Sequence, residues 1–76
     1  MTPTAALVEY LARRLVEKPD EVRVEEDDAL VIRLHVAEED LGRVIGRGGR
    51  IARALRTLVR AGGAHGDQRV LLEIVE

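Results

Sequence analysis

The sequence predicts an α+β domain in which three helices pack on one face of a three-stranded mixed sheet. Two observations lead to this fold class. Apolar residues recur at helical spacing in three stretches and alternate, as they do in strands, in three others. The resulting order is helix, strand, strand, helix, glycine-rich turn, helix, strand. Because each element has one apolar face, two layers are the economical way to bury all of them.

The first helix is expected over residues 2–17. Thr2 is suited to cap it and Pro3 to occupy its first turn. Helical spacing marks the expected buried stripe as Leu7, Val8, Leu11, Ala12 and Leu15. Proline at position 19 then ends the helix.

A β-hairpin with one apolar face is expected next. Val22 and Val24 lie on one face of the first strand, and residues 30–36 alternate again. The inward residues of this second strand are Leu30, Ile32, Leu34 and Val36. The acidic residues 26–28 are expected to form the hairpin turn. A calcium-binding loop is not expected here, because the acids lack the 12-residue ligand spacing of such a loop. His35 and His65 have no partners at metal-binding or catalytic spacing, so no metal site is expected.

Two helices joined by a glycine-rich turn follow. Glu38, Glu39 and Asp40 precede a short helix that carries Leu41, Val44 and Ile45. Gly46 is suited to end it, because the residue after a helix often needs a positive φ.

The longer helix is expected from about residue 49 to residue 61. Its inner face should hold Ile51, Ala54, Leu55 and Leu58, with Val59 at the edge. Residues 64–67 then connect it to a last strand over residues 68–75. The inward residues of that strand are Val70, Leu72 and Ile74.

Length and composition exclude several classes of protein. With 76 residues there is room for one domain, residues 1–76, with one modest core, so a deep catalytic pocket is not expected. No apolar run approaches the ~18 residues of a membrane span, and the N-terminus lacks the layout of a signal peptide. We therefore expect a cytoplasmic protein. The absence of cysteine excludes disulfides and thiolate metal sites.

The charges are sorted along the chain. Residues 41–60 carry six arginines and no acid, whereas the remaining residues carry six basic and fourteen acidic groups. The net charge of −2 therefore conceals a basic stretch, and this stretch contains the glycine-rich turn. A basic stretch alone is compatible with a solvated helix face. Its coincidence with the turn favours a polyanionic ligand such as a nucleic acid.

The tetrad Gly46-Arg47-Gly48-Gly49 lacks the spacing of a nucleotide-cofactor loop. A dinucleotide site needs G-x-G-x-x-G directly after a strand, whereas here a helix precedes the turn and the last position is Ile51. An NTPase phosphate loop needs lysine and then Ser or Thr after its last glycine, which this sequence lacks. Neither an enzyme nor a cofactor is therefore expected. A helix-turn-helix that reads duplex DNA stays open, although the second helix offers only arginine and one threonine for base contacts.

The same tetrad resembles the G-x-x-G of a KH domain, and the preceding Val44-Ile45 completes that family's V-I-G-x-x-G core. The extra helix and strand ahead of this core are similar to the type II KH arrangement. Over essentially all 76 residues the chain resembles the small bacterial single-KH proteins of the KhpA family. This resemblance implies a non-catalytic RNA-binding protein, with a role as an RNA chaperone or post-transcriptional regulator linked to control of cell shape and size. It also implies pairing, as a homodimer or with a larger KH-containing RNA-binding protein of the KhpB type.

The expected site is a clamp for the backbone of single-stranded RNA. Glycines let a phosphodiester approach the main chain, and the start of the second helix directs N–H groups at the same place. Arg47 is the only charged side chain within the turn, because Gly48 fills a position where the family often has a polar or basic residue. The expected RNA-binding residues are Arg33, Arg43, Val44, Ile45, Gly46, Arg47, Gly48, Gly49, Arg50 and Arg53.

Base contacts are expected in a groove between the turn and the sheet. Its apolar floor would draw on Val44, Ile45 and Ile51, with Leu34 or Val36 contributing from the neighbouring strand. KH domains clamp about four unpaired nucleotides in such a groove. A KH-like module that binds an acidic protein instead of RNA remains an alternative. The outward residues Val31, Leu71 and Val75 indicate that the second face of the sheet could be an interface.

Overall fold

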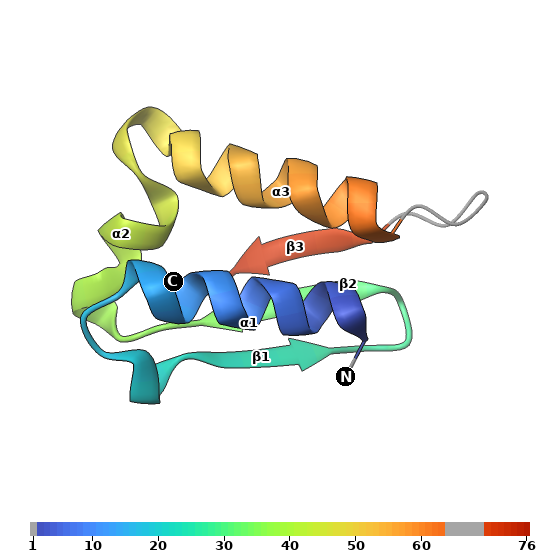
Figure 1. Cartoon of the computed structure of the whole chain (residues 1–76), viewed down its shortest axis with the longest axis horizontal. Coiled ribbons are helices and arrows are strands. Elements are labelled where there is room, and N and C mark those ends of the chain that lie inside the picture. Colours follow the sequence, from blue (N-terminus) through green and yellow to red (C-terminus); the bar gives the residue numbers. More distant parts are fainter. Residues whose placement is uncertain (1, 64–69) are drawn as a thin grey trace.

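The computed structural model, which describes residues 2–63 and 70–76, has the predicted architecture (Figure 1). Within this part of the chain the helices are α1 (Pro3–Leu15), α2 (Leu41–Ile45) and α3 (Arg50–Gly63). The strands are β1 (Arg23–Glu26), β2 (Val31–His35) and β3 (Leu71–Ile74). Three short 3₁₀ turns complete the order, namely η1 (Pro19–Glu21), η2 (Glu38–Asp40) and η3 (Arg47–Gly49).

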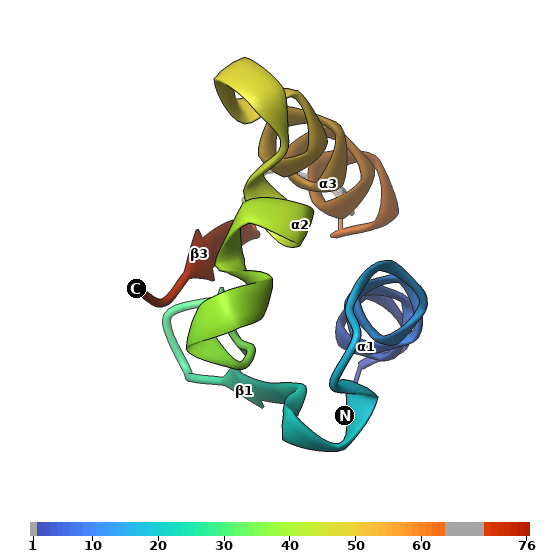
Figure 2. The same ribbon diagram turned by 90° about the vertical axis from the view of Figure 1, so that its left-hand side faces the viewer.

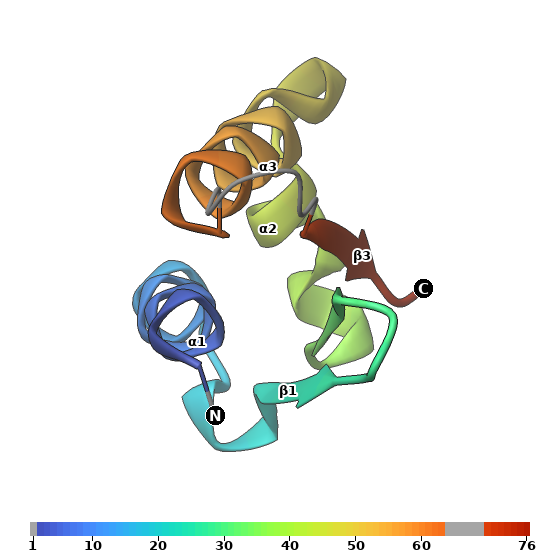
Figure 3. The same ribbon diagram turned by 90° about the vertical axis from the view of Figure 1, so that its right-hand side faces the viewer.

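The sheet is mixed, as predicted. Its strand order is β1-β2-β3, with β1 antiparallel and β3 parallel to the central strand. Figures 2 and 3 show the helices on one face of this sheet, with α1 and β3 on opposite sides of the molecule. The α+β prediction, three helices packed on a three-stranded mixed sheet, is therefore confirmed.

The start of α1 is tied to the hairpin. The Thr2 hydroxyl accepts a hydrogen bond from the Ala5 N–H (3.2 Å), which confirms the predicted cap. Thr2 N and Oγ1 in turn each donate to the carboxylate of Glu26, both at 2.9 Å. The buried residues of α1 are Ala5, Val8 and Ala12. Leu7 was predicted in this stripe and is 42% exposed, because the helix turns its two small alanines toward the rest of the core.

The hairpin turn lies further along the chain than predicted. Leu30 N donates to Asp27 O, and the Asp27 carboxylate accepts hydrogen bonds from the N–H groups of Ala29 and Val31. The hydrogen bond from the Val31 N–H is the main reason that the pKa of Asp27 lies below its ordinary value. Leu30 therefore lies within the turn, at a φ of 63°, and is exposed rather than inward as predicted. The inward residues of the following strand, Ile32 and Leu34, are buried as predicted.

The rotation of α3 differs from the prediction. Its buried residues are Ala52, Leu55 and Val59, whereas Ala54 and Leu58 are exposed. The stripe from 52 to 59 keeps the i, i+3, i+7 spacing of one helix face. The sequence offers a second apolar stripe one position earlier, and packing against α1, α2 and β3 selects the later one.

The last strand confirms the predicted alternation, with Leu72 and Ile74 buried. Residues 68 and 69 of the predicted strand lie outside the described residues, as do the predicted connector 64–67 and His65. The core joins residues from all three α-helices, from β2 and β3, and Val22 just before β1, and Val24 of β1 packs against it. Its fully buried large apolar side chains are Ile32, Leu34, Val44 and Val59. In the described ranges, no helix has both the length and the apolar character needed to cross a membrane.

Candidate nucleic-acid interface

The glycine-rich turn joins α2 to α3 at one corner of the molecule (Figure 1). Helix α2 ends at Gly46, whose N–H donates to Gly42 O (2.9 Å), and Gly49 N then donates to Gly46 O (3.1 Å). Positive φ angles occur at Gly46 (77°), Gly48 (62°) and Gly49 (79°). The turn thus has a defined conformation that depends on glycine at three positions.

These glycines are needed for different reasons. A Cβ on Gly46 would lie 2.7 Å from Cγ1 and 2.9 Å from N of Ile51, so close packing excludes any side chain there. A Cβ on Gly48 or Gly49 would meet nothing within 4 Å, and only the backbone angle favours glycine. The inner side of the turn is therefore closed against the start of α3, whereas the outer side is open to a ligand.

Three exposed arginines accompany this open side. Arg47 lies in the turn itself, and Arg50 and Arg53 follow at the start of α3. None of them forms an ion pair with another residue that the structure describes. The dipole of α3 adds further positive potential at the same place. The turn is therefore suited to hold phosphate groups.

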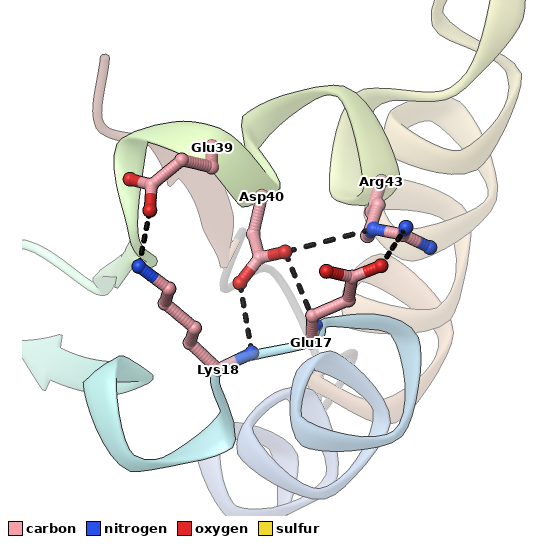
Figure 4. Close-up of polar contacts among 5 residues, drawn as sticks. All are labelled: Glu17, Lys18, Glu39, Asp40 and Arg43. Carbon is pink, nitrogen blue, oxygen red and sulfur yellow. Dashed lines mark hydrogen bonds and ion pairs between the residues drawn. The ribbon is translucent and has the colours of Figure 1, made fainter.

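Two other arginines predicted to bind RNA have acidic partners instead. Arg33, on the sheet face away from the helices, lies 2.9 Å from the Asp27 carboxylate. Arg43 forms an ion pair with Glu17, and its Nε lies 3.6 Å from Asp40 Oδ1 (Figure 4). An acidic partner thus compensates the charge of both residues, and their contact with RNA stays a prediction.

The predicted apolar floor is only partly accessible. Val44 and Leu34 have 0% of their surface exposed, so both side chains belong to the core and cannot contact a base. Ile45, Ile51 and Val36 are half-buried and pack against that core. Of the predicted floor, these three residues therefore keep some accessible apolar surface. Val44 contributes only by packing in the core.

A hollow of about 400 Å³ lies between α3 and β3. Residues 70–74 line it from the strand, and Arg56 and Arg60 line it from the helix. Arg56 Nε donates to Leu72 O (3.4 Å), so main-chain carbonyl groups of β3 face the hollow. In Figure 1, β3 points toward the end of α3 at which the turn lies.

Sequence reasoning did not place Arg56 and Arg60 at the site. Their spacing of four residues puts them together on one flank of α3. That signal was visible in the sequence, but which flank faces β3 depends on the rotation of the helix, which was predicted wrongly.

Asp40 is a second residue that sequence reasoning missed. It is 2% exposed and is the one buried charged side chain among the described residues. Its carboxylate accepts hydrogen bonds from Glu17 N (3.1 Å) and Lys18 N (3.0 Å), directly after α1 (Figure 4). Beside it, Lys18 Nζ donates to Glu39, which raises the pKa of Lys18 and lowers the pKa of Glu39. The sequence offers three consecutive acids here and nothing that singles out the buried one.

An open G-x-x-G turn between two helices, packed with a preceding helix on a three-stranded mixed sheet, defines a KH domain with type II element order. A sequence profile described as "KhpA/KhpB, KH domain" matches residues 5–74. The chain belongs to this KhpA/KhpB KH-domain family.

Curated relatives agree with this assignment. The chain is 43% identical over 72 residues to the RNA-binding protein KhpA of Clostridium perfringens, covering 91% of this chain and 96% of the relative. The protein of the same name from Caldanaerobacter subterraneus subsp. tengcongensis is 47% identical over 72 residues, with the same coverage. That of Treponema pallidum is 44% identical over 79 residues, covering 100% of this chain and 99% of the relative. No solved structure matches the chain.

Proposed function

We propose that this protein binds single-stranded RNA without catalysing a reaction, and that the glycine turn holds the RNA backbone. The observation that carries this proposal is the open outer side of the turn, beside the start of α3 and three arginines without ion-pair partners among the described residues. The relatives are named RNA-binding proteins, which supports RNA as the ligand. An RNA ligand in turn favours a cytoplasmic location.

Each part of the turn has a role in this clamp. Gly48 and Gly49 let a phosphate approach main-chain N–H groups, since no side chain covers them. Arg47 supplies a forked donor to phosphate oxygens, and Arg50 and Arg53 extend the positive field along α3. These contacts hold a backbone in register but do not distinguish one base from another.

Unpaired bases fit the remaining surface. The hollow beside β3 combines apolar walls, main-chain carbonyl groups and two arginines, Arg56 and Arg60. Such groups can pack against a base and bond its exposed edge, whereas a duplex keeps those edges paired. The structure therefore favours single-stranded RNA over the duplex DNA of a helix-turn-helix.

Titration of labelled single-stranded RNA and of duplex DNA at two salt concentrations tests the function. We expect the RNA to bind more tightly, with a log–log salt slope of roughly −1.4 to −2.1 for two to three phosphate contacts. Tighter binding of the duplex would favour the helix-turn-helix alternative. Absence of binding to either nucleic acid would favour the alternative of a protein-interaction module.

We infer further that the protein acts in pairs, either with a second copy or with a larger KH-containing protein of the KhpB type. Two linked clamps on one strand raise the effective concentration of the second, which a lone small site needs for useful affinity. Large apolar side chains are exposed on two helices that pack against each other, Leu7 and Tyr10 on α1 and Leu58 on α3 (the helices are seen in Figures 1 and 3). These exposed apolar residues support pairing, and a role as an RNA chaperone or post-transcriptional regulator would use the paired form.

Replacement of Leu58 by glutamate is expected to convert the pair to a monomer in light scattering, because it buries a charge in the proposed contact. Leu71→Glu is the matched control. Leu71 is also exposed, but it lies on the sheet, where its partner on β2 is Val31. A pair that survives Leu58→Glu and dissociates with Leu71→Glu would move the interface to the sheet.

A further inference from the structure

A buried carboxylate, that of Asp40, joins the end of α1 to the beginning of α2. Both carboxylate oxygens of Asp40 accept main-chain N–H groups, Oδ1 from Glu17 and Oδ2 from Lys18. An aspartate at the start of a helix commonly caps that helix, but the Asp40 side chain makes no capping bond to α2. It instead satisfies two donors of the chain that leaves α1, 22 and 23 residues earlier in the sequence.

Helix α2 depends on such anchors for its position. It has five residues, too few for a helix to be stable by itself, so its surroundings must fix its place and direction. Val44 fixes its middle in the core, and Gly46 packs against Ile51 at its end. Asp40 fixes its beginning. Because α2 leads directly into the glycine turn, the position of the turn relative to α1 and the sheet depends on this carboxylate.

The same contact also decides which charges face the turn. Arg43 lies on α2, one helical turn after Asp40, and pairs with both Asp40 and Glu17 (Figure 4). The guanidinium is therefore directed toward the end of α1. This leaves Arg47, Arg50 and Arg53 as the cations at the start of α3.

We propose that Asp40 is a positioning residue for RNA binding: by holding the beginning of α2 against the end of α1, it sets the place of the glycine turn. This inference rests on the proposed function. Asp40 is 2% exposed and cannot itself touch RNA, so any effect on affinity must act through the turn.

The test uses the whole chain with Asp40→Asn, which keeps the shape of the side chain but replaces one acceptor oxygen by a donor. Val22→Ala is the matched control, since Val22 is buried in the same core but lies between η1 and β1 and has no part in α2. Two quantities are measured well below the unfolding temperature of each variant. One is the affinity for single-stranded RNA, and the other is the hydrogen exchange rate of the turn amides in the absence of RNA.

We expect Asp40→Asn to weaken RNA binding by roughly 2- to 30-fold, the range typical of residues that couple to a site without touching its ligand. The turn amides should exchange faster, while Val22→Ala changes neither quantity. Parent-like affinity in folded Asp40→Asn, or an equal loss in Val22→Ala, would overturn the inference. If the parent itself does not bind RNA, the proposed function fails and the exchange data decide alone: faster turn exchange in Asp40→Asn supports the positioning role and unchanged exchange refutes it.

Discussion

Replacement of Gly46 by alanine is expected to lower the free energy of unfolding by about 3 kcal/mol. Two costs combine. The φ of 77° and ψ of 169° at Gly46 belong to a region that essentially only glycine adopts. In addition, the new methyl group would lie 2.7 Å from the side chain and 2.9 Å from the main-chain nitrogen of Ile51, so the beginning of α3 would have to move. Urea unfolding followed by circular dichroism measures the loss.

Gly48→Ala is the control for a left-handed backbone position that lacks a close contact. Gly48 also has a positive φ, but a Cβ there meets nothing within 4 Å. Its replacement should cost only about 1 kcal/mol, the penalty of the left-handed conformation for a residue with a side chain. Equal losses in the two variants would show that contact with Ile51 does not decide the role of Gly46.

The features that the sequence predicted correctly are those that depend on local chemistry. The cap at Thr2, the positive φ at Gly46 and the alternation of Ile32 and Leu34 each follow from residues close together in the chain. The fold class followed as well, because a set of one-sided elements in this order has few ways to bury its apolar faces.

The errors concern choices that only tertiary packing makes. Leu58 and Val59 both continue an apolar stripe on α3, and the sequence alone does not decide which of them faces the core. Whichever of the two residues faces the core sets the rotation of α3. That rotation determines which flank of the helix meets β3, and hence whether Arg56 and Arg60 lie at the site. Leu30 was misplaced for a different, local reason: the Asp27 side chain accepts hydrogen bonds from Ala29 and Val31 and thereby includes Leu30 in the turn.

The charged residues show the same limit. Periodicity placed Arg33 on the correct, outward face of its strand, but it did not reveal the neighbouring carboxylate. Arg43 meets Glu17 only because the end of α1 returns to the beginning of α2. The Arg43–Glu17 pair joins residues far apart in the sequence, and a single sequence contains no local pattern that predicts it. Of the arginines predicted to bind RNA, those without an ion-pair partner among the described residues are the three at the turn and the start of α3.

Reversing the charge of the turn, with Arg47→Asp and Gly48→Asp together, is expected to weaken binding of single-stranded RNA by about 100-fold or more, since one lost charge-assisted hydrogen bond costs ~1.5–3 kcal/mol. The variant removes the one cation inside the turn and puts two carboxylates where a phosphate would lie. Positions 47 and 48 are both exposed, and aspartate tolerates the left-handed conformation of Gly48 better than most residues. The fold should therefore persist. Titration of labelled RNA measures the affinity, and circular dichroism checks the helix content.

A control with the same change in net charge separates a local contact from a general electrostatic effect. Ala6→Asp combined with Arg14→Asp alters two exposed positions on α1, outside the glycine turn. If the long-range field of the protein governed binding, this pair would weaken it as much as the change in the turn does. If the turn holds phosphates directly, the control should cost only a few-fold, and that loss should shrink with added salt, because surface charges beyond ~10 Å are screened at 0.1 M. A folded turn variant that binds RNA as tightly as the parent would rule out the clamp at Gly46 to Gly49.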